Sequence, residues 1–179
     1  MVNSLDSWLT SFIYSIIPHN QFFDYFFTIF SQTASSLPVW ITILIILFIF
    51  AEVKDRRFLF FVLLVFFLSS IIVTPVLKTL TKKPRPCHIS AVNKYPCPSD
   101  FSFPSGHATT SFAIATVFSL FDKKRRYLYY IIAGLIGLSR IYLGIHYLFD
   151  VVAGAIIGYT ISKTILAFLK KLSTSSHRH

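Results

Sequence analysis

The chain has 179 residues, of which 54% are hydrophobic and 13% charged, and its mean hydropathy is +0.65. This composition fits one domain and excludes an ordinary soluble protein. The formal net charge is +10, but the basic residues form short clusters between apolar runs, which indicates contact with anionic lipid headgroups rather than nucleic acid.

The first segment, 1–18, has apolar residues at helical spacing and ends at Pro18, which predicts an amphipathic helix lying in the membrane interface. Residues 22–36 are apolar and aromatic but short, and Asp24 interrupts them. This stretch is either a tilted first span or one arm of a half-buried hairpin. Because no lysine or arginine precedes Lys54, charge gives no orientation here.

Longer apolar runs follow, and twenty residues of helix reach roughly 30 Å, the thickness of the hydrocarbon core. The predicted spans are 39–51, 58–80, 104–121, 127–143 and 146–170. Pro75 predicts a kink, and Gly154 and Gly158 have a spacing suited to close helix contact. We therefore predict a single all-α domain over 1–179, a polytopic membrane helix bundle of about six transmembrane helices. It has an active-site loop over 78–103 and a flexible tail over 172–179.

The segment 139–150 places three ionisable side chains inside an apolar run. His146 and Asp150 are four residues apart, so on a helix they share one face and can meet. A carboxylate bonded to one imidazole nitrogen fixes the tautomer and leaves the other nitrogen free as base or nucleophile. Arg140 supplies a planar fork that suits phosphate. The alternative for this stretch alone is a helix end with snorkelling charges.

Two further motifs lie upstream, Pro104-Ser105-Gly106-His107 and Lys78 followed by Arg85-Pro86. In order, the patterns KxxxxxxRP, PSGH and SRxxxxxHxxxD resemble the three motifs of the type 2 phosphatidic acid phosphatase superfamily. That family contains membrane lipid phosphatases and shares its site with vanadium haloperoxidases. The resemblance spans Lys78 to Asp150, and every defining residue and spacing is present.

The resemblance implies that His146 is a nucleophile forming a phosphohistidine, that Asp150 orients it, and that His107 protonates the leaving group. It also implies that the site needs no metal and no other cofactor. Positive side chains and a helix N-terminus neutralise phosphate charge, and glycine lets the backbone approach closely. The expected phosphate-binding residues are Lys78, Arg85, Ser105, Gly106 and Arg140.

The loop before the second motif holds further polar residues. Cys87 and Cys97 are the only cysteines, and they form either a disulfide in an oxidising compartment or two unpaired thiols. His88 and Asp100 match no family position and are either substrate contacts or solvated loop residues.

Orientation follows from counting crossings. The basic clusters at 54–57, 123–126 and 170–171 are each separated by two spans, so with Arg178 they place ten basic residues on one side against six on the other. The positive-inside rule puts that side in the cytoplasm and the motifs at the outer membrane–water interface. We expect a bacterial inner membrane protein whose site faces the periplasm or exterior.

The predicted function is an integral membrane phosphatase acting on a lipid phosphate or diphosphate. By resemblance, the candidate substrates are undecaprenyl diphosphate, phosphatidylglycerophosphate, phosphatidic acid and the lipid A 1-phosphate. Membrane lipids are the expected partners, with no nucleic acid. The alternatives are a phosphotransferase using the same phosphohistidine, and a transporter, which would need polar residues at mid-membrane depth.

Overall fold

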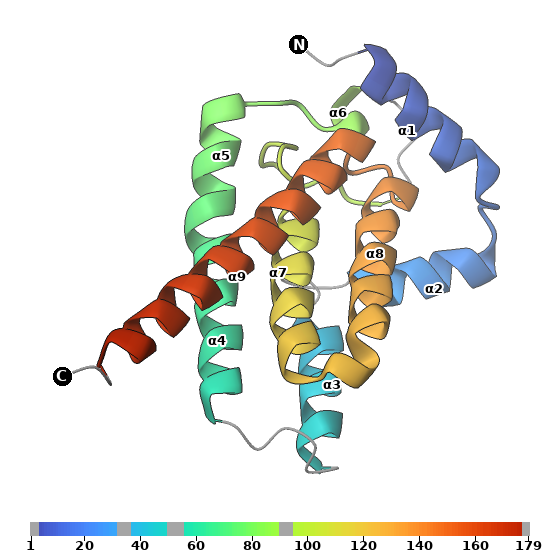
Figure 1. Cartoon of the computed structure of the whole chain (residues 1–179). Helices are drawn as coiled ribbons and strands as arrows, with labels where there is room; N and C mark the ends of the chain where they lie inside the picture. Colours follow the sequence, from blue (N-terminus) through green and yellow to red (C-terminus); the bar gives the residue numbers. More distant parts are fainter. Residues whose placement is uncertain (1–3, 32–36, 50–55, 90–94, 177–179) are drawn as a thin grey trace.

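The computed structural model describes residues 4–31, 37–49, 56–89 and 95–176, and these ranges contain helices and loops without a β-strand. Figure 1 shows the arrangement. The elements in order are α1 Ser4–Ile16, α2 Gln21–Ser31, α3 Leu37–Ile49, α4 Arg56–Phe67, the π-helix η2 Leu68–Val73, α5 Thr74–Thr81, α6 Pro86–Ile89, α7 Gly106–Phe121, the 3₁₀ turn η3 Lys123–Arg125, α8 Arg126–Tyr142 and α9 Leu148–Ser176. The predicted all-α class is confirmed.

The predicted span over 58–80 is one continuous column made of α4, η2 and α5 (Figure 1). Its 25 residues from Arg57 to Thr81 are long and apolar enough to cross a membrane, as are the 22 residues Leu148–Leu169 of α9. The column continues through Pro75, and the helix widens just before it, where the Thr74 N–H and hydroxyl both donate to the Ser69 carbonyl.

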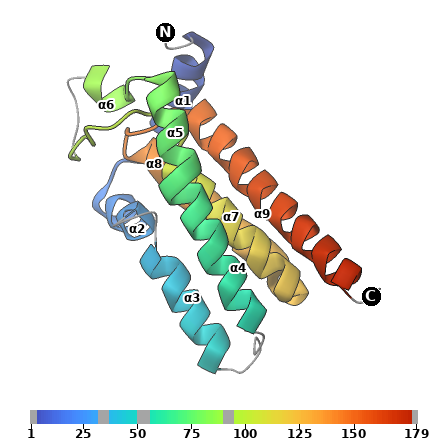
Figure 2. The ribbon, with the colours of Figure 1, turned by 90° about the vertical axis from the view of Figure 1, so that its left-hand side faces the viewer.

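Helix α7 lies at the centre of the bundle and packs against α4, α8 and α9 (Figures 1 and 2). The contact with α9 is close because glycines face α7. A Cβ at Gly154 would lie 2.7 Å from the Ser105 carbonyl oxygen, and one at Gly158 would lie 2.9 Å from the Ala113 nitrogen. The predicted small-residue contact is therefore confirmed, and it joins α7 and α9 into one packed unit.

The two ends of the bundle differ in chemistry. The start of α4 and the η3 turn lie at the lower end of Figure 1, whereas the loop after α5 and the α8–α9 connection lie at the upper end. The basic cluster 123–126 and the three motifs are therefore at opposite ends, as the count of crossings predicts. Residues 54 and 55 of the first cluster's range, of which Lys54 is basic, lie outside the described residues.

Helix α1 forms where 1–18 predicts it, but its polar face turns inward. Asp6 and Thr10 are buried, whereas Leu5, Trp8 and Phe12 are each more than half exposed. The helix thus turns Asp6 and Thr10 toward the protein, where they bond to α9, while these large apolar side chains face outward.

Helix α2 covers the first part of the predicted segment 22–36, of which 32–36 lie outside the described residues. It has 11 residues and lies across the direction of the long helices in both ribbon views (Figures 1 and 2). At 1.5 Å per residue its length is about 16 Å, which is half of a hydrocarbon core. Of the expected tail over 172–179, α9 continues through 172–176, and 177–179 are not described.

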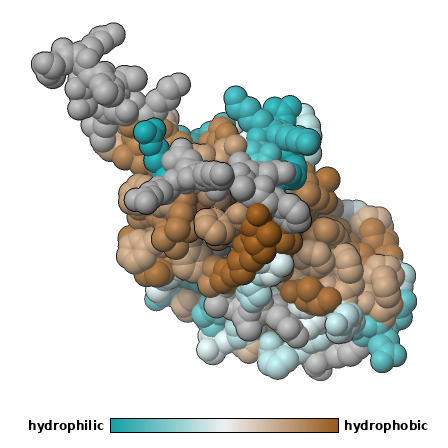
Figure 3. Space-filling model, turned by 90° about the horizontal axis from the view of Figure 1, so that it is seen from below, coloured by the Kyte–Doolittle hydropathy of each residue, from teal (hydrophilic) through white to brown (hydrophobic). Residues whose placement is uncertain are grey.

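The described surface is largely apolar. Large side chains such as Phe22, Phe48 and Leu80 are at least 70% exposed. Seen from below, apolar side chains dominate and hydrophilic ones gather in separate groups (Figure 3). An exposed apolar surface of this extent marks a membrane-contacting face.

Candidate active site

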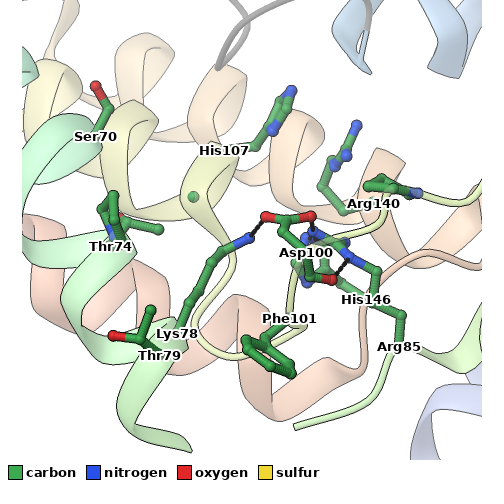
Figure 4. Close-up of a pocket in the computed structure, with 13 residues that line it drawn as sticks. Ser70, Thr74, Lys78, Thr79, Arg85, Asp100, Phe101, His107, Arg140 and His146 are labelled. Carbon is green, nitrogen blue, oxygen red and sulfur yellow. Dashed lines mark hydrogen bonds and ion pairs between the residues drawn. The ribbon is translucent and has the colours of Figure 1, made fainter. Parts of the chain in front are cut away.

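A cavity of about 550 Å³ opens at the upper end of the bundle and collects most of the predicted residues. Lys78 comes from the last turn of α5, His107 from the first turn of α7, and Arg140 from the last turn of α8. Arg85, Gly106 and His146 complete this set in the cavity wall (Figure 4). Ser105 and Asp150 are fully buried and are not among the lining residues.

His146 and Asp150 meet, although not as two positions on one helix. His146 lies in the α8–α9 connection, which turns at Gly144 with φ 68°. Helix α9 begins at Leu148, two residues after His146. His146 Nδ1 is 3.5 Å from Asp150 Oδ2. The side chain of Asp150 also accepts a bond from the Tyr147 N–H at 3.0 Å, which caps the helix start. The expectation of a shared helical face is thus replaced by a capped turn that achieves the same contact.

The other imidazole nitrogen identifies the tautomer. His146 Nε2 is 2.9 Å from Nη1 of Arg85, and a guanidinium can only donate. Nε2 therefore carries the lone pair and Nδ1 carries the proton, which is directed to Asp150. This is the arrangement that a nucleophilic imidazole requires.

The charge state of His146 agrees with that role. Burial in the apolar interior lowers the pKa of His146 to about 3, and Arg85 and Arg140 push it the same way against the bond to Asp150. The imidazole is consequently neutral at physiological pH, and in this structure its Nε2 lone pair accepts the hydrogen bond from Arg85.

Asp150 is held by more partners than the motif supplies. The Ser102 hydroxyl donates to Oδ2 at 2.5 Å, and Lys83 Nζ is 2.7 Å from Oδ1. Lys83 also contacts Asp6 Oδ2 at 2.7 Å, so one ammonium bridges two buried carboxylates. Sequence reasoning missed Lys83, Ser102 and Asp6, and the signal available was the polar Asp6–Thr10 pair at helical spacing on the predicted amphipathic helix.

The cationic side of the cavity is occupied by a loop carboxylate. Asp100 Oδ1 is 2.6 Å from Nη2 of Arg85, and its Oδ2 bonds to Lys78 (Figure 4). Partial burial raises the pKa of Asp100, but the bonds and charges of Lys78 and Arg85 outweigh it and the net shift is downward. The structure places the Asp100 carboxylate beside Lys78 and Arg85, two of the residues that the resemblance expects to bind phosphate. The side chain of His88 is not described.

Arg140 and His107 retain unused donor or acceptor atoms. Arg140 Nη1 bonds to the hydroxyl and carbonyl of Ser31, while its Nε has no partner among the described residues. Within the same described part of the chain, Nε2 of His107 is also buried without a partner. Such orphaned atoms at a cavity are what an incoming ligand would satisfy.

The start of α7 differs slightly from the prediction. The helix begins at Gly106 rather than Pro104, because Ser105 caps it and accepts a bond from the Ala108 N–H at 3.4 Å. The Ser105 N–H donates to the Asp150 carbonyl at 3.0 Å, so this backbone group ties the second motif to the third. Gly106 lines the cavity, whereas a phosphate contact by Ser105 stays a prediction.

Cys87 and Cys97 form a disulfide with a Cα–Cα distance of 5.8 Å, which resolves the two alternatives for these residues. The bond joins two points of the loop between α5 and α7. Cys87 lies two residues after Arg85, and Cys97 lies three residues before Asp100. The bond thereby restrains two of the residues that meet in the cavity.

The family model described as PAP2 superfamily matches residues 58–173. The chain belongs to the PAP2 superfamily. This membership confirms the family to which the three motifs point, and α1 to α3 lie outside the matched region.

Solved members of the family have a similar fold. The structure of Aquifex aeolicus LpxE is 30% identical, with a TM-score of 0.74 over 92% of this chain and 96% of that one. The PAP2-type phosphatidylglycerolphosphate phosphatase of Bacillus subtilis is 27% identical, with a TM-score of 0.71 over 94% of this chain and 86% of that one. The undecaprenyl-diphosphatase of Sulfolobus acidocaldarius is 35% identical over 69% of this chain and 60% of its own length. In three curated relatives, the matched regions span 36%, 51% and 60% of the relative's own length, so this chain aligns with only part of each.

Proposed function

We propose that this chain is an integral membrane phosphatase that hydrolyses a lipid phosphate or diphosphate through a phosphohistidine, without a metal ion. The observation that carries the proposal is His146, whose Nε2 lone pair lies at the cationic cavity wall while Nδ1–H is directed to Asp150. The family membership and the names of the relatives support a lipid phosphate as substrate.

In the proposed reaction, Nε2 of His146 attacks phosphorus and the bond to the leaving oxygen breaks. Lys78, Arg85 and Arg140 stabilise the charge on the phosphoryl oxygens, with the N–H of Gly106 at the start of α7. His107 gives its proton to the leaving oxygen. It then takes a proton from the water that hydrolyses the phosphohistidine, which returns both histidines to their starting states.

The proposed setting is a membrane crossed by the long helices of the bundle, with the cavity at the outer surface. The lipid headgroup would sit level with the cavity and its tails among the exposed apolar side chains. The basic cluster at the opposite end and the disulfide in the active-site loop both support an outward cavity, because disulfides persist in oxidising compartments. About six crossings stays a prediction, since α2 alone is too short for one.

The activity is tested by phosphate release from purified protein in detergent, across undecaprenyl diphosphate, phosphatidylglycerophosphate, phosphatidic acid and lipid A 1-phosphate. Release from at least one lipid with no acceptor added is expected, and it separates a phosphatase from a phosphotransferase. His146→Ala should abolish release and the ³²P label retained on the protein. His19→Ala, which changes an exposed histidine outside the cavity, should do neither. No release from any lipid by the wild type would refute the proposal.

Sidedness needs a separate experiment. A cysteine at Ser99, with Cys87 and Cys97 removed, should react with a membrane-impermeant reagent added to intact cells. A cysteine at Lys123, at the opposite end of the bundle, should react only after lysis. The reverse pattern would place the cavity in the cytoplasm.

A further inference from the structure

We infer that Lys83 and Asp6 are positioning residues, an inference that rests on the phosphatase function proposed above: Lys83 keeps Asp150 ionised, while Asp6 holds Lys83 and the start of α9 so that Asp150 stays oriented toward His146. Neither is a defining residue of the three motifs, since Lys83 occupies a variable position of the first one, and Asp6 lies outside the region that matches the family. Helix α1 then contributes a positioning residue to the active site.

The first observation is the geometry of the charges. Lys83 Nζ is 2.7 Å from Asp6 Oδ2 and 2.7 Å from Asp150 Oδ1. The side chain of Lys83 is 15% exposed, and those of Asp6 and Asp150 are 1% and 0% exposed. Charges this deeply buried persist only when they are paired.

The second observation is that α1 holds the start of α9. Asp6 Oδ1 accepts a bond from the Phe149 N–H, and the Thr10 hydroxyl accepts one from the Leu148 N–H, both at 2.9 Å. These N–H groups in the first turn of α9, which have no partner within the helix, belong to the two residues that precede Asp150. Asp6 therefore fixes the backbone from which Asp150 projects as well as the ammonium that neutralises it.

Without the ammonium, two buried carboxylates would face each other and the proton affinity of the pair would rise. A proton taken up by Asp150 would turn an acceptor into a donor, and Nδ1–H of His146 would lose its partner. The imidazole would then no longer be held with its Nε2 lone pair toward the substrate. The defect would fall on the chemical step, because Lys83 is not among the residues that line the cavity.

The test compares steady-state kinetics of four variants on the best lipid substrate. Lys83→Met should lower kcat about 10- to 100-fold, the usual range for residues that orient a reactive ligand, with KM within about threefold of wild type. Asp6→Asn keeps the acceptor for Phe149 and removes the charge, so its effect should stay below about fivefold. Lys83→Arg should retain most activity. The matched control is Lys82→Met at the adjacent, exposed lysine, and it should match wild type.

The deciding measurement is the double variant Asp6→Asn/Lys83→Met. Removing the second carboxylate relieves the repulsion, so kcat should recover by about tenfold over Lys83→Met alone, a coupling typical of contacting charges. A purely structural role predicts the opposite, since two lost contacts would be worse than one. If Lys83→Met does not accumulate in membranes, the double variant should accumulate.

Three results would overturn the inference: a double variant no better than Lys83→Met, an unchanged Lys83→Met, or a defect confined to KM. The last would make Lys83 another phosphate-binding cation. A wild type without phosphatase activity would instead refute the proposed function, so the two failures are distinguishable.

Discussion

The carboxylate of Asp100 pairs with Lys78 and Arg85, two of the cations proposed to bind phosphate, so removing its charge should tighten phosphate binding. Asp100 pairs with Lys78 and Arg85, whose side chains are 12% and 3% exposed, while its own is 53% exposed. For pairs this open to water, each contact is worth about 0.5–1 kcal/mol. Displacing both costs a ligand about 1–2 kcal/mol, which corresponds to roughly five- to thirtyfold in affinity.

The assay is inhibition by inorganic phosphate and orthovanadate, together with KM for a lipid substrate. Asp100→Asn should lower both inhibition constants and KM by about five- to thirtyfold, with kcat little changed. Because the pKa of Asp100 is lowered, the carboxylate stays charged near neutral pH, and the ratio between variant and wild type should be constant there. Asp122→Asn, at the other end of the bundle, is the control. Weaker phosphate binding by Asp100→Asn would refute the reasoning, because it would show that Asp100 orients the cations instead of competing for them.

Three further predictions concern the metal, the second histidine and the helix contact. Activity should survive EDTA and be inhibited by vanadate, and a loss in EDTA that magnesium or zinc restores would contradict the mechanism. His107→Ala should lose about 100- to 10,000-fold on a lipid monoester but recover in part on p-nitrophenyl phosphate, whose phenolate leaves without a proton, whereas His146→Ala should be inactive on both; equal losses would remove the general-acid role. Gly158→Ala should lower the free energy of unfolding by about 1–3 kcal/mol, seen as a lower Tm in detergent, because the new Cβ meets the α7 backbone. Gly134→Ala meets nothing within 4 Å and should keep or raise the Tm, so similar changes in both would contradict the packing argument.

The sequence predicts the features that depend on residues close together in the chain. The apolar runs give the helices, and the spacing of His146 and Asp150 survives even though a capped turn replaces the expected helix. The position of Gly154 and Gly158 also carries over, because a small-residue stripe means close approach wherever the partner helix comes from.

The residues that sequence could not predict depend on contacts between distant segments. Lys83 and Asp6 are 77 positions apart and become partners only when α1 folds over the start of α9. From the sequence, Asp100 is either a substrate contact or a solvated loop residue, and only the folded loop brings it to Arg85. The sequence pattern predicts which residues share a face of α1. It does not predict whether that face contacts water or a buried lysine.

Because α7 packs closely on α9, the parts of the site differ in how far they tolerate substitution. His107 and Asp150 belong to that packed pair, and a glycine contact leaves no slack between the helices for adjustment. Lys78 lies on α5, which continues from a π-helical turn outside that packed pair, and Asp100 lies on a loop. Headgroups of different size would therefore be accommodated by changes in α5 and in 95–103, while the reacting groups keep their spacing. Libraries of variants selected for new lipid substrates should carry substitutions in those two segments and none at the α7–α9 contact.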